Sequence, residues 1–432
     1  MSKLAQIWRA KDLRNKIIIV ALLLVGTRIL AHIPIPGIEV ANLQSFLANN
    51  QLFGLYNIFS GGGLSNFSVA MLGVGPYITA SIIMQLLTII IPKLGEMQKE
   101  GGEAGRAKIN QYMRYLTVPL TCLQAYGTIV LLSRQTAAGV ISDFTAFQWF
   151  VVLLSVTTGT LLLLWLGELI SEYKIGNGVS LIIFAGIVAS LPASAQQIYA
   201  TLTTSTGALS STSIATIAGY LVAALAVIAG IVMITEAQRN IPVSYAKRVR
   251  GNKLYGGVNT HLPLRVNQAG VIPIIFAISI MLFPGLIANF FSQAKTPAVA
   301  QAAQAINTFF QNQTYYGILY FLLVIAFTYF YTAIVFNPDE ISENIQKQGG
   351  FIPGLRPGRQ TSDFLYKVLN RITLAGAVFL GLIAVLPYIV QGFTNTQALT
   401  IGGTSILIVV SVVIEVIKQV QSQMVMRDYE NF

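Results

Sequence analysis

The sequence is poor in the residues that most enzymes and metal sites require. One cysteine, Cys122, and two histidines, His32 and His261, occur in 432 residues. A single cysteine cannot form a disulfide within the chain, and these three residues do not have the spacing of a metal site or of a Cys/His nucleophile. No Walker A motif is present to bind a nucleotide. The sequence therefore predicts a protein that is not an enzyme and that carries no metal or organic cofactor.

Charged residues are also scarce, at 10% against 54% hydrophobic residues. Soluble proteins contain about a quarter charged residues. The apolar runs are about 17 to 25 residues long, which suits helices that cross roughly 30 Å of hydrocarbon and not barrel strands of roughly 10 residues. We predict an all-α polytopic membrane protein with ten transmembrane helices. These are 17–33, 67–91, 115–133, 148–167, 178–195, 214–234, 269–290, 316–336, 368–390 and 401–419.

Lysine and arginine lie almost entirely on one side of these predicted helices. When loops are counted alternately from the N-terminus, all but three of the 27 basic residues fall on one side. The exceptions are Arg134 and Lys295 on the other side and Arg28 inside the first span. By the positive-inside rule, the basic side is cytoplasmic and holds both termini. A cleaved signal peptide fits less well, because its removal would break this alternation.

Ten spans divide into two groups of five, and two similar halves of five spans would lie in opposite orientations. The second span of each half contains a Gly/Pro-interrupted stretch, GVGPYI and AGVIPIIF. We therefore expect two inverted five-helix halves with the functional site at their interface. The expected divisions are a basic segment 1–16, a first half 17–198, a second half 199–420 with cytoplasmic loops 236–265 and 337–367, and a tail 421–432.

The predicted spans contain almost no ionisable residues. Arg28 lies toward the outer end of the first span, and Glu168 and Glu415 lie near the cytoplasmic ends of the fourth and tenth. Snorkelling or local pairing is the expected role of all three, with a structural contact between Arg28 and the segment 54–65 as an alternative. Without interior charges, a conduit would have to be closed by a dry apolar constriction. A secondary transporter remains an alternative, because it shares inverted repeats and can hold sodium with backbone carbonyls. A structural assembly subunit, which needs no constriction, is the second alternative.

Three consecutive glycines, Gly61, Gly62 and Gly63, interrupt the chain before the second span. The segment 54–65 is too short to cross the membrane, and irregular backbone at membrane depth requires protein or a water-filled cavity around it. The glycines would let a short helix fold back against the next span on a permissive hinge. An ordinary glycine-rich outer loop explains the same residues equally well, so both interpretations stay open at this point.

Five long motifs, spread in order over essentially the whole chain, closely resemble the SecY family of bacterial translocon pore subunits. They are GVGPYITASIIMQLL (73–87), KIGNGVSLIIFAGIVASLP (174–192), THLPLRVNQAGVIPIIFA (260–277), GFIPGLRPGRQT (350–361) and GGTSILIVV (402–410). The resemblance implies an hourglass channel between the two halves, closed outside by a re-entrant plug and able to open sideways to lipid. It implies that unfolded secretory chains cross a bacterial inner membrane here and that transmembrane segments leave laterally.

The resemblance also places the parts of such a channel on this sequence. The apolar pore ring falls on Val74, Ile78, Ile183, Ile275 and Ile408, with Ile272 as a further candidate. Branched apolar side chains suit a seal, although packing is the ordinary role of any single isoleucine. The plug falls on 54–65, with Tyr56, Asn57, Ile58, Phe59, Ser60, Gly61, Gly62, Gly63 and Leu64. The lateral gate includes Ser81, Gln85, Thr88, Asn267 and Gln268, for which helix–helix hydrogen bonding is an alternative role.

The two long cytoplasmic loops are expected to meet partners. The first interleaves basic residues with tyrosines, and the second ends in a Gly/Pro-shaped tip. Positive-inside topology and attraction to anionic lipids explain these charges without a protein partner. The resemblance instead implies that the motor ATPase SecA and the ribosome dock here, with rRNA phosphates near Arg248, Arg250, Lys253, Arg356 and Arg359. It further implies the subunits SecE and SecG, and signal sequences and secretory polypeptides as cargo.

Overall fold

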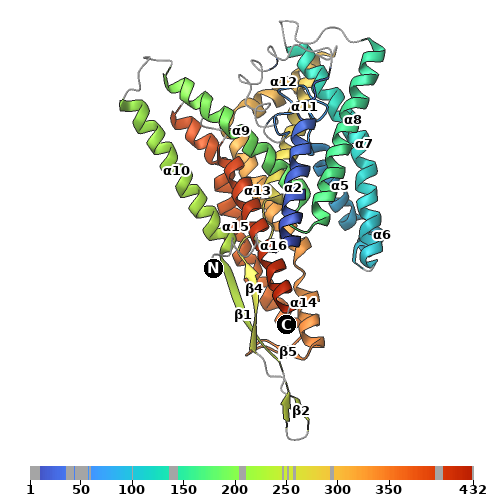
Figure 1. Cartoon of the computed structure of the whole chain (residues 1–432), viewed down its shortest axis with the longest axis vertical. Helices are drawn as coiled ribbons and strands as arrows, with labels where there is room; N and C mark the ends of the chain where they lie inside the picture. The colour runs from blue at the N-terminus through green and yellow to red at the C-terminus, as the bar shows by residue number, and fades with distance from the viewer. Residues whose placement is uncertain are drawn as a thin grey trace.

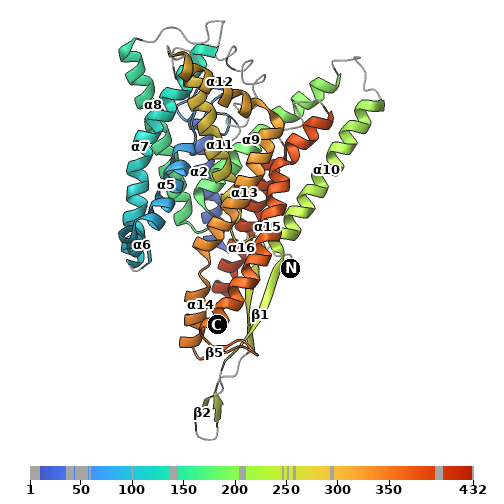
Figure 2. The same ribbon diagram turned by 180° about the vertical axis from the view of Figure 1, so that it is seen from behind.

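A computed structural model describes most of the chain, in which helices dominate (Figures 1 and 2). The described residues are 10–35, 43, 57, 60–99, 101–135, 145–203, 211–245, 248–250, 253–255, 259–291, 296–394 and 402–430. The long helices are α2 (Lys11–Leu30), α5 (Gly75–Ile90), α7 (Gly102–Gln135), α8 (Ala146–Glu172), α9 (Gly178–Thr203), α10 (Ser211–Glu236), α11 (Ile272–Phe291), α13 (Gln313–Val335), α15 (Arg359–Thr394) and α16 (Gly402–Glu430). Each predicted span overlaps one of them, so the all-α prediction is confirmed.

The lengths of the apolar helices agree with a polytopic membrane protein. Within the described residues, four helices are long and apolar enough to cross a membrane. A fifth candidate is the pair α5 and α6 (Pro92–Lys99), which is bent by 108°. The bend falls at Ile91, whose extended backbone is the conformation favoured before a proline. Parts of α9, α10 and α11 are shorter apolar helices, so the number of ten spans stays a prediction.

Helices from the two ends of the sequence pack against each other in the middle of the molecule. In Figure 1, α7 and α8 stand at one side and α10 at the other. Between them, α11 packs against α5 and α7 as well as against α13 and α15, and α9 packs against α16. Residues from both predicted halves therefore line a shared interior.

The predicted start of the second span is wrong. Residues 60–74 form a series of turns, and the helix begins only at Gly75. Within the predicted span, Phe67 (φ +41°) and Gly73 (φ +56°) have left-handed backbone that a right-handed helix cannot include. Pro76 then lies in the first turn of α5, where its missing N–H costs nothing.

This turn segment is buried, unlike an exposed outer loop. Leu64, Phe67 and Met71 are fully buried against Ile129 of α7 and Val156 of α8. The backbone N–H of Val69 donates to the carbonyl of Ile33 after α2 at 3.0 Å, which ties the segment to the first helix. The segment therefore occupies a space enclosed by α2, α7 and α8.

The contact between the end of α8 and the start of α9 depends on a glycine. A Cβ on Gly178 would lie 1.7 Å from the carbonyl oxygen of Gly167. Ser171 braces the same contact, because its hydroxyl donates to Gly167 O and accepts from Gly178 N–H, both at 2.9 Å. We expect Gly178→Ala to destabilise the protein by about 2–4 kcal/mol, in the range of severe backbone substitutions. The thermal midpoint of the purified protein in detergent measures this.

Gly127 supplies the matched control for that substitution. It lies within α7, and a Cβ there would meet nothing within 4 Å. Gly127→Ala should leave the midpoint unchanged or raise it slightly, because alanine favours the helix by about 1 kcal/mol. Equal midpoints for the two variants would contradict the close contact at Gly178.

Short strands join the two long loops 236–265 and 337–367, a feature that the sequence analysis did not predict. β1 (Gln238–Tyr245) pairs antiparallel with β4 (Asn259–Arg265), and β5 (Gly350–Phe351) pairs with the other edge of β1. A hairpin of β2 (Arg248–Arg250) and β3 (Lys253–Tyr255) projects beyond this sheet (Figure 1). Gly251-Asn252 between the two short runs was the available turn signal.

The sheet has its own small hydrophobic core. Ile241 and Val243 of β1 and Leu264 of β4 are buried against Phe336 and Leu365 at the ends of α13 and α15. The two helices α12 (Pro297–Gln311) and α14 (Pro338–Lys347) were also not predicted. α14 packs on the start of α15 beside the sheet.

Candidate functional site

The five predicted ring residues lie together in one buried hydrophobic cluster, called here the central cluster. They come from the start of α5, from α9, from α11 and from α16, which are far apart in the sequence. Their exposed fractions are 2% for Val74, 8% for Ile78, 1% for Ile183, 8% for Ile275 and 1% for Ile408. Ile272 packs against the same cluster and is partly buried. The structure thus brings all five residues to one place.

Two turns of the same local geometry place Ile78 and Ile275 in the central cluster. Gly73 and Gly270 both have positive φ, at +56° and +65°, and each is followed three residues later by a proline that starts a helix. Ile78 and Ile275 both lie five residues after these glycines. The same local geometry therefore occurs once in each predicted half, at the two stretches that the sequence singled out.

Further members of the central cluster lie one helical turn from the predicted ones. Ile82 follows Ile78 in α5, Ile187 follows Ile183 in α9, and Val412 follows Ile408 in α16. Residues four apart lie on the same helical face, so the cluster extends along the helices instead of forming a single layer. The i, i+4 spacing of branched residues was the signal from which these three could have been found.

The predicted plug segment lies only partly within the described residues. Tyr56, Ile58 and Phe59 lie outside them, Asn57 has helical backbone, and residues 60–65 form turns. The short helix expected before the glycines therefore stays a prediction. Asn57 organises this turn, because its carbonyl accepts from Gly62 N–H and its Oδ1 accepts from Ser65 N–H, both at 2.8 Å. Ser60, Gly61, Gly63 and Leu64 are buried.

Arg28 lies against the glycine turn, a contact that the sequence analysis gave only as an alternative to snorkelling or local pairing. Gly61 and Gly62 have φ of +68° and +81°. A Cβ on Gly61 would be 2.6 Å from Arg28 Nη1 and 3.1 Å from Cα of Gly186 in α9, whereas a Cβ on Gly62 would meet nothing closer than 3.9 Å. The absence of a side chain at Gly61 therefore makes room for the guanidinium.

A small cavity connects this turn to the central cluster. Its volume is about 10 Å³, roughly the space of one water molecule. Arg28 and Ser60 supply polar walls, and Val74 and Ile182 of the central cluster supply apolar ones. The turn thus borders the cluster directly.

Three predicted gate residues lie on α5 and two lie just before α11, and these two helices pack against each other. The hydrogen bonds of these side chains are local: Gln85 Nε2 donates to Ser81 Oγ at 3.2 Å, Thr88 Oγ1 to Gln85 O at 2.7 Å, and Asn267 Nδ2 to Gly270 O at 3.2 Å. Gln268 is partly buried. Gln85 Oε1 and Asn267 Oδ1 are buried and have no hydrogen-bond partner among the residues that the structure describes. An unpaired buried acceptor costs about 1–3 kcal/mol, so these side chains weaken the packing that they belong to.

The predicted partner-facing residues lie on the two loops that β1 and β5 join. Arg356 and Arg359 are exposed, and Gly354 (φ +85°) and Gly358 (φ +97°) shape the backbone around them. Arg248, Arg250 and Lys253 belong to the β2–β3 hairpin, and their side chains lie outside the described ones. The Tyr245 hydroxyl donates to Gln348 Oε1 at 3.3 Å between the loops.

Two ion pairs account for acidic residues near the ends of the spans. Arg114 of α7 pairs with Glu168 of α8 at 2.7 Å, and Lys418 of α16 pairs with Glu236 of α10 at 2.8 Å.

Cys122 lies beside Thr157 with Sγ and Oγ1 3.4 Å apart, as a packing residue between α7 and α8. Among the described residues, no three His, Cys, Asp or Glu side chains gather to hold a metal ion.

Comparison with known proteins points to one family. The SecY family model matches residues 68–417. Protein translocase subunit SecY of Streptomyces galbus is 42% identical over 444 aligned residues, covering 100% of this chain and 99% of that protein. A solved structure of a protein-conducting channel superposes with a TM-score of 0.63 at 18% identity, covering 94% of this chain and 91% of that one. Sec61 in the canine ribosome–channel complex from the endoplasmic reticulum gives a TM-score of 0.59 at 18% identity with the same coverage.

Proposed function

The chain belongs to the SecY family, and we propose that it forms the polypeptide-conducting channel of a protein translocase. The observation that carries this proposal is the central cluster, in which branched side chains of four helices from both ends of the sequence close one shared interior. Such a seal excludes water and ions by being apolar and can part for a chain of any sequence. Unfolded secretory polypeptides would pass through it, and transmembrane segments would leave sideways into lipid.

In this proposal the two halves, 17–198 and 199–420, are inverted repeats around an hourglass pore. The repeated turn before α5 and α11 supports that arrangement, since it presents Ile78 and Ile275 from equivalent positions. The buried turn at 60–65 acts as the plug on the outer side of the ring. The unpaired acceptors of Gln85 and Asn267 lower the stability of the closed gate between α5 and α11.

The cytoplasmic loops supply the proposed docking surface for the energy source. The chain needs SecA or the elongating ribosome to drive movement, and the exposed Arg356 and Arg359 offer charges to either partner. Pairing of β1 with β5 makes the two loops one unit, so both would respond to one partner. SecE and SecG would complete the complex in a bacterial inner membrane, with both termini of this chain cytoplasmic.

Site-specific crosslinking tests conduction through the central cluster. A photoreactive residue is placed at Ile78 or Ile275 while a secretory chain is arrested halfway, with Cys122 replaced to remove background labelling. We expect crosslinks to the arrested chain from both positions, and we expect them to disappear when the signal sequence is deleted.

Two control positions make this experiment specific. Ile274 is fully buried in a different cluster, and Leu322 of α13 is 56% exposed on the outside. Neither should contact the arrested chain. Crosslinks from Leu322 without any from Ile78 or Ile275 would place the polypeptide outside the central cluster and overturn the proposal.

A further inference from the structure

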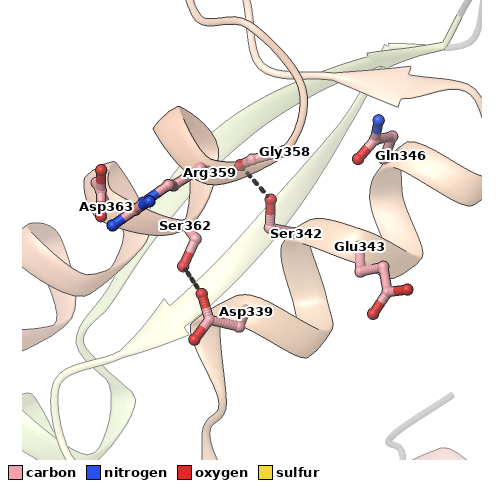
Figure 3. A pocket seen from close by; sticks show the side chains of 8 residues that line it. All are labelled: Asp339, Ser342, Glu343, Gln346, Gly358, Arg359, Ser362 and Asp363. Atoms are coloured by element: carbon pink, nitrogen blue, oxygen red, sulfur yellow. Dashed lines mark hydrogen bonds between the residues drawn. The ribbon is translucent and has the colours of Figure 1, made fainter.

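A long groove runs along the seam between α13 and α15 and continues under α14. Its upper cavity, about 500 Å³, is lined by Tyr329, Phe336 and Tyr366 among others. Its lower cavity, about 560 Å³, lies between α14 and the start of α15 (Figure 3). Asp339, Ser362 and Asp363 line both cavities, so the two adjoin at these residues. We call the whole the α13–α15 groove.

The upper end of the groove opens on the surface that faces lipid. On α13, Tyr329 and Ala333 continue the exposed stripe of Ile318 and Leu322 at helical spacing. On α15, Tyr366 and Asn370 likewise continue the stripe of Leu374 and Leu382. Exposed apolar stripes of membrane-spanning helices face acyl chains, and tyrosines favour the level of the lipid head groups. The groove therefore begins at the cytoplasmic edge of the bilayer.

The lower end of the groove carries excess negative charge. Asp339 and Asp363 form no ion pair among the described residues, although Asp339 accepts a hydrogen bond from the Ser362 hydroxyl. Glu343 is neutralised by Lys347 at 2.9 Å. Among the described residues that line this cavity, Arg359 is the only cation. Two unpaired carboxylates against one guanidinium favour an occupant that brings positive charge.

Two basic side chains of α15, Lys367 and Arg371, are exposed but line neither cavity. From the membrane towards the cytoplasm, the groove itself is thus apolar and then acidic. A phospholipid with an amine head group has the complementary order, with its acyl chains followed by its ammonium.

We propose that the α13–α15 groove binds one phospholipid of the cytoplasmic leaflet whose head group carries a primary ammonium, of the phosphatidylethanolamine type. The N–H groups of the ammonium donate to the carboxylates of Asp339 and Asp363, as charge-assisted hydrogen bonds. The acyl chains follow the exposed stripes of α13 and α15. A trimethylated head group has no N–H to donate, so the site discriminates against phosphatidylcholine.

Native mass spectrometry of the purified, delipidated full-length protein tests this proposal. Phosphatidylethanolamine, phosphatidylcholine and phosphatidylglycerol with identical acyl chains are added in turn. We expect phosphatidylethanolamine to bind about tenfold more tightly than phosphatidylcholine, the ratio expected from losing hydrogen bonds to charged groups. In the variant Asp339→Asn/Asp363→Asn, which keeps both side-chain shapes, the ratio should fall to about one.

A matched variant removes two negative charges away from the groove. Glu340 on α14 and Glu103 on α7 are exposed and line neither cavity. Glu340→Gln/Glu103→Gln should keep the preference of the unaltered protein. Equal binding of all three lipids, a preference for phosphatidylglycerol or phosphatidylcholine, or a preference that survives in the double asparagine variant would overturn the proposal.

A second measurement does not depend on how the asparagine variant folds. A photoreactive amino acid replaces Tyr366, which is 59% exposed, in native membranes. A crosslink to an amine phospholipid supports the proposal, and a crosslink to a polypeptide shows that a partner helix fills the groove instead. Both measurements are made without translocation, so their failure is separate from failure of the proposed channel function.

Discussion

Replacing Ile78 or Ile275 with asparagine should make the resting protein leak ions. Both side chains are 8% exposed and pack among the hydrophobic side chains of the central cluster. An amide introduced there would hydrate, because leaving it buried without a hydrogen bond costs about 1–3 kcal/mol. We expect the resting conductance of the reconstituted channel to rise about tenfold or more, since 1.4 kcal/mol corresponds to a factor of ten.

The neighbouring Ile274 separates a broken seal from general loosening. It is fully buried but packs with Met281 and Tyr320 in a different cluster. Ile274→Asn should lower the thermal midpoint without raising the conductance. Planar bilayer recordings of the three variants decide between the two effects. Equal leaks from Ile274→Asn and Ile275→Asn, or no leak from any of them, would show that the central cluster is not the seal.

The membership of the central cluster was predictable from motifs but not from composition. In a chain with 54% hydrophobic residues, nothing in the residue type distinguishes Ile275 from Ile274. Position in a recognised motif separated them, and the structure places them in different clusters. The roles of these residues in a pore remain predictions until the conductance is measured.

The helical spans were predictable because hydrophobic length is a strong signal, whereas the backbone at their ends was not. Hydropathy continued from Phe67 into α5, so the start of the second span was placed too early. The deciding features were left-handed backbone at Phe67 and Gly73, and a phenylalanine gives no local sign of such a conformation. The contact of Arg28 with the glycine turn is likewise a tertiary feature, between residues more than thirty positions apart.

Replacing Gly61 with alanine should open the closed channel through its effect on the plug turn. The left-handed backbone at φ +68° costs an alanine about 1 kcal/mol. The new methyl would also press on Gly186 Cα of α9 and displace the guanidinium of Arg28 from the turn. We expect a total of about 2 kcal/mol, which shifts the balance towards a displaced plug about 30-fold. Resting conductance, and crosslinking of residue 61 to α9 in the closed state, measure this shift.

Gly62 isolates the contact from the backbone strain. It has a similar φ of +81°, but a Cβ there would meet nothing closer than 3.9 Å. Gly62→Ala should therefore leak less than Gly61→Ala. The double variant Gly61→Ala/Arg28→Ala also removes the guanidinium. Its increase in resting conductance should be less than the sum of the increases in the two single variants, because the new methyl then occupies the vacated space. Additive effects, or equal leaks from the two alanine variants, would mean that Arg28 does not hold the turn in place.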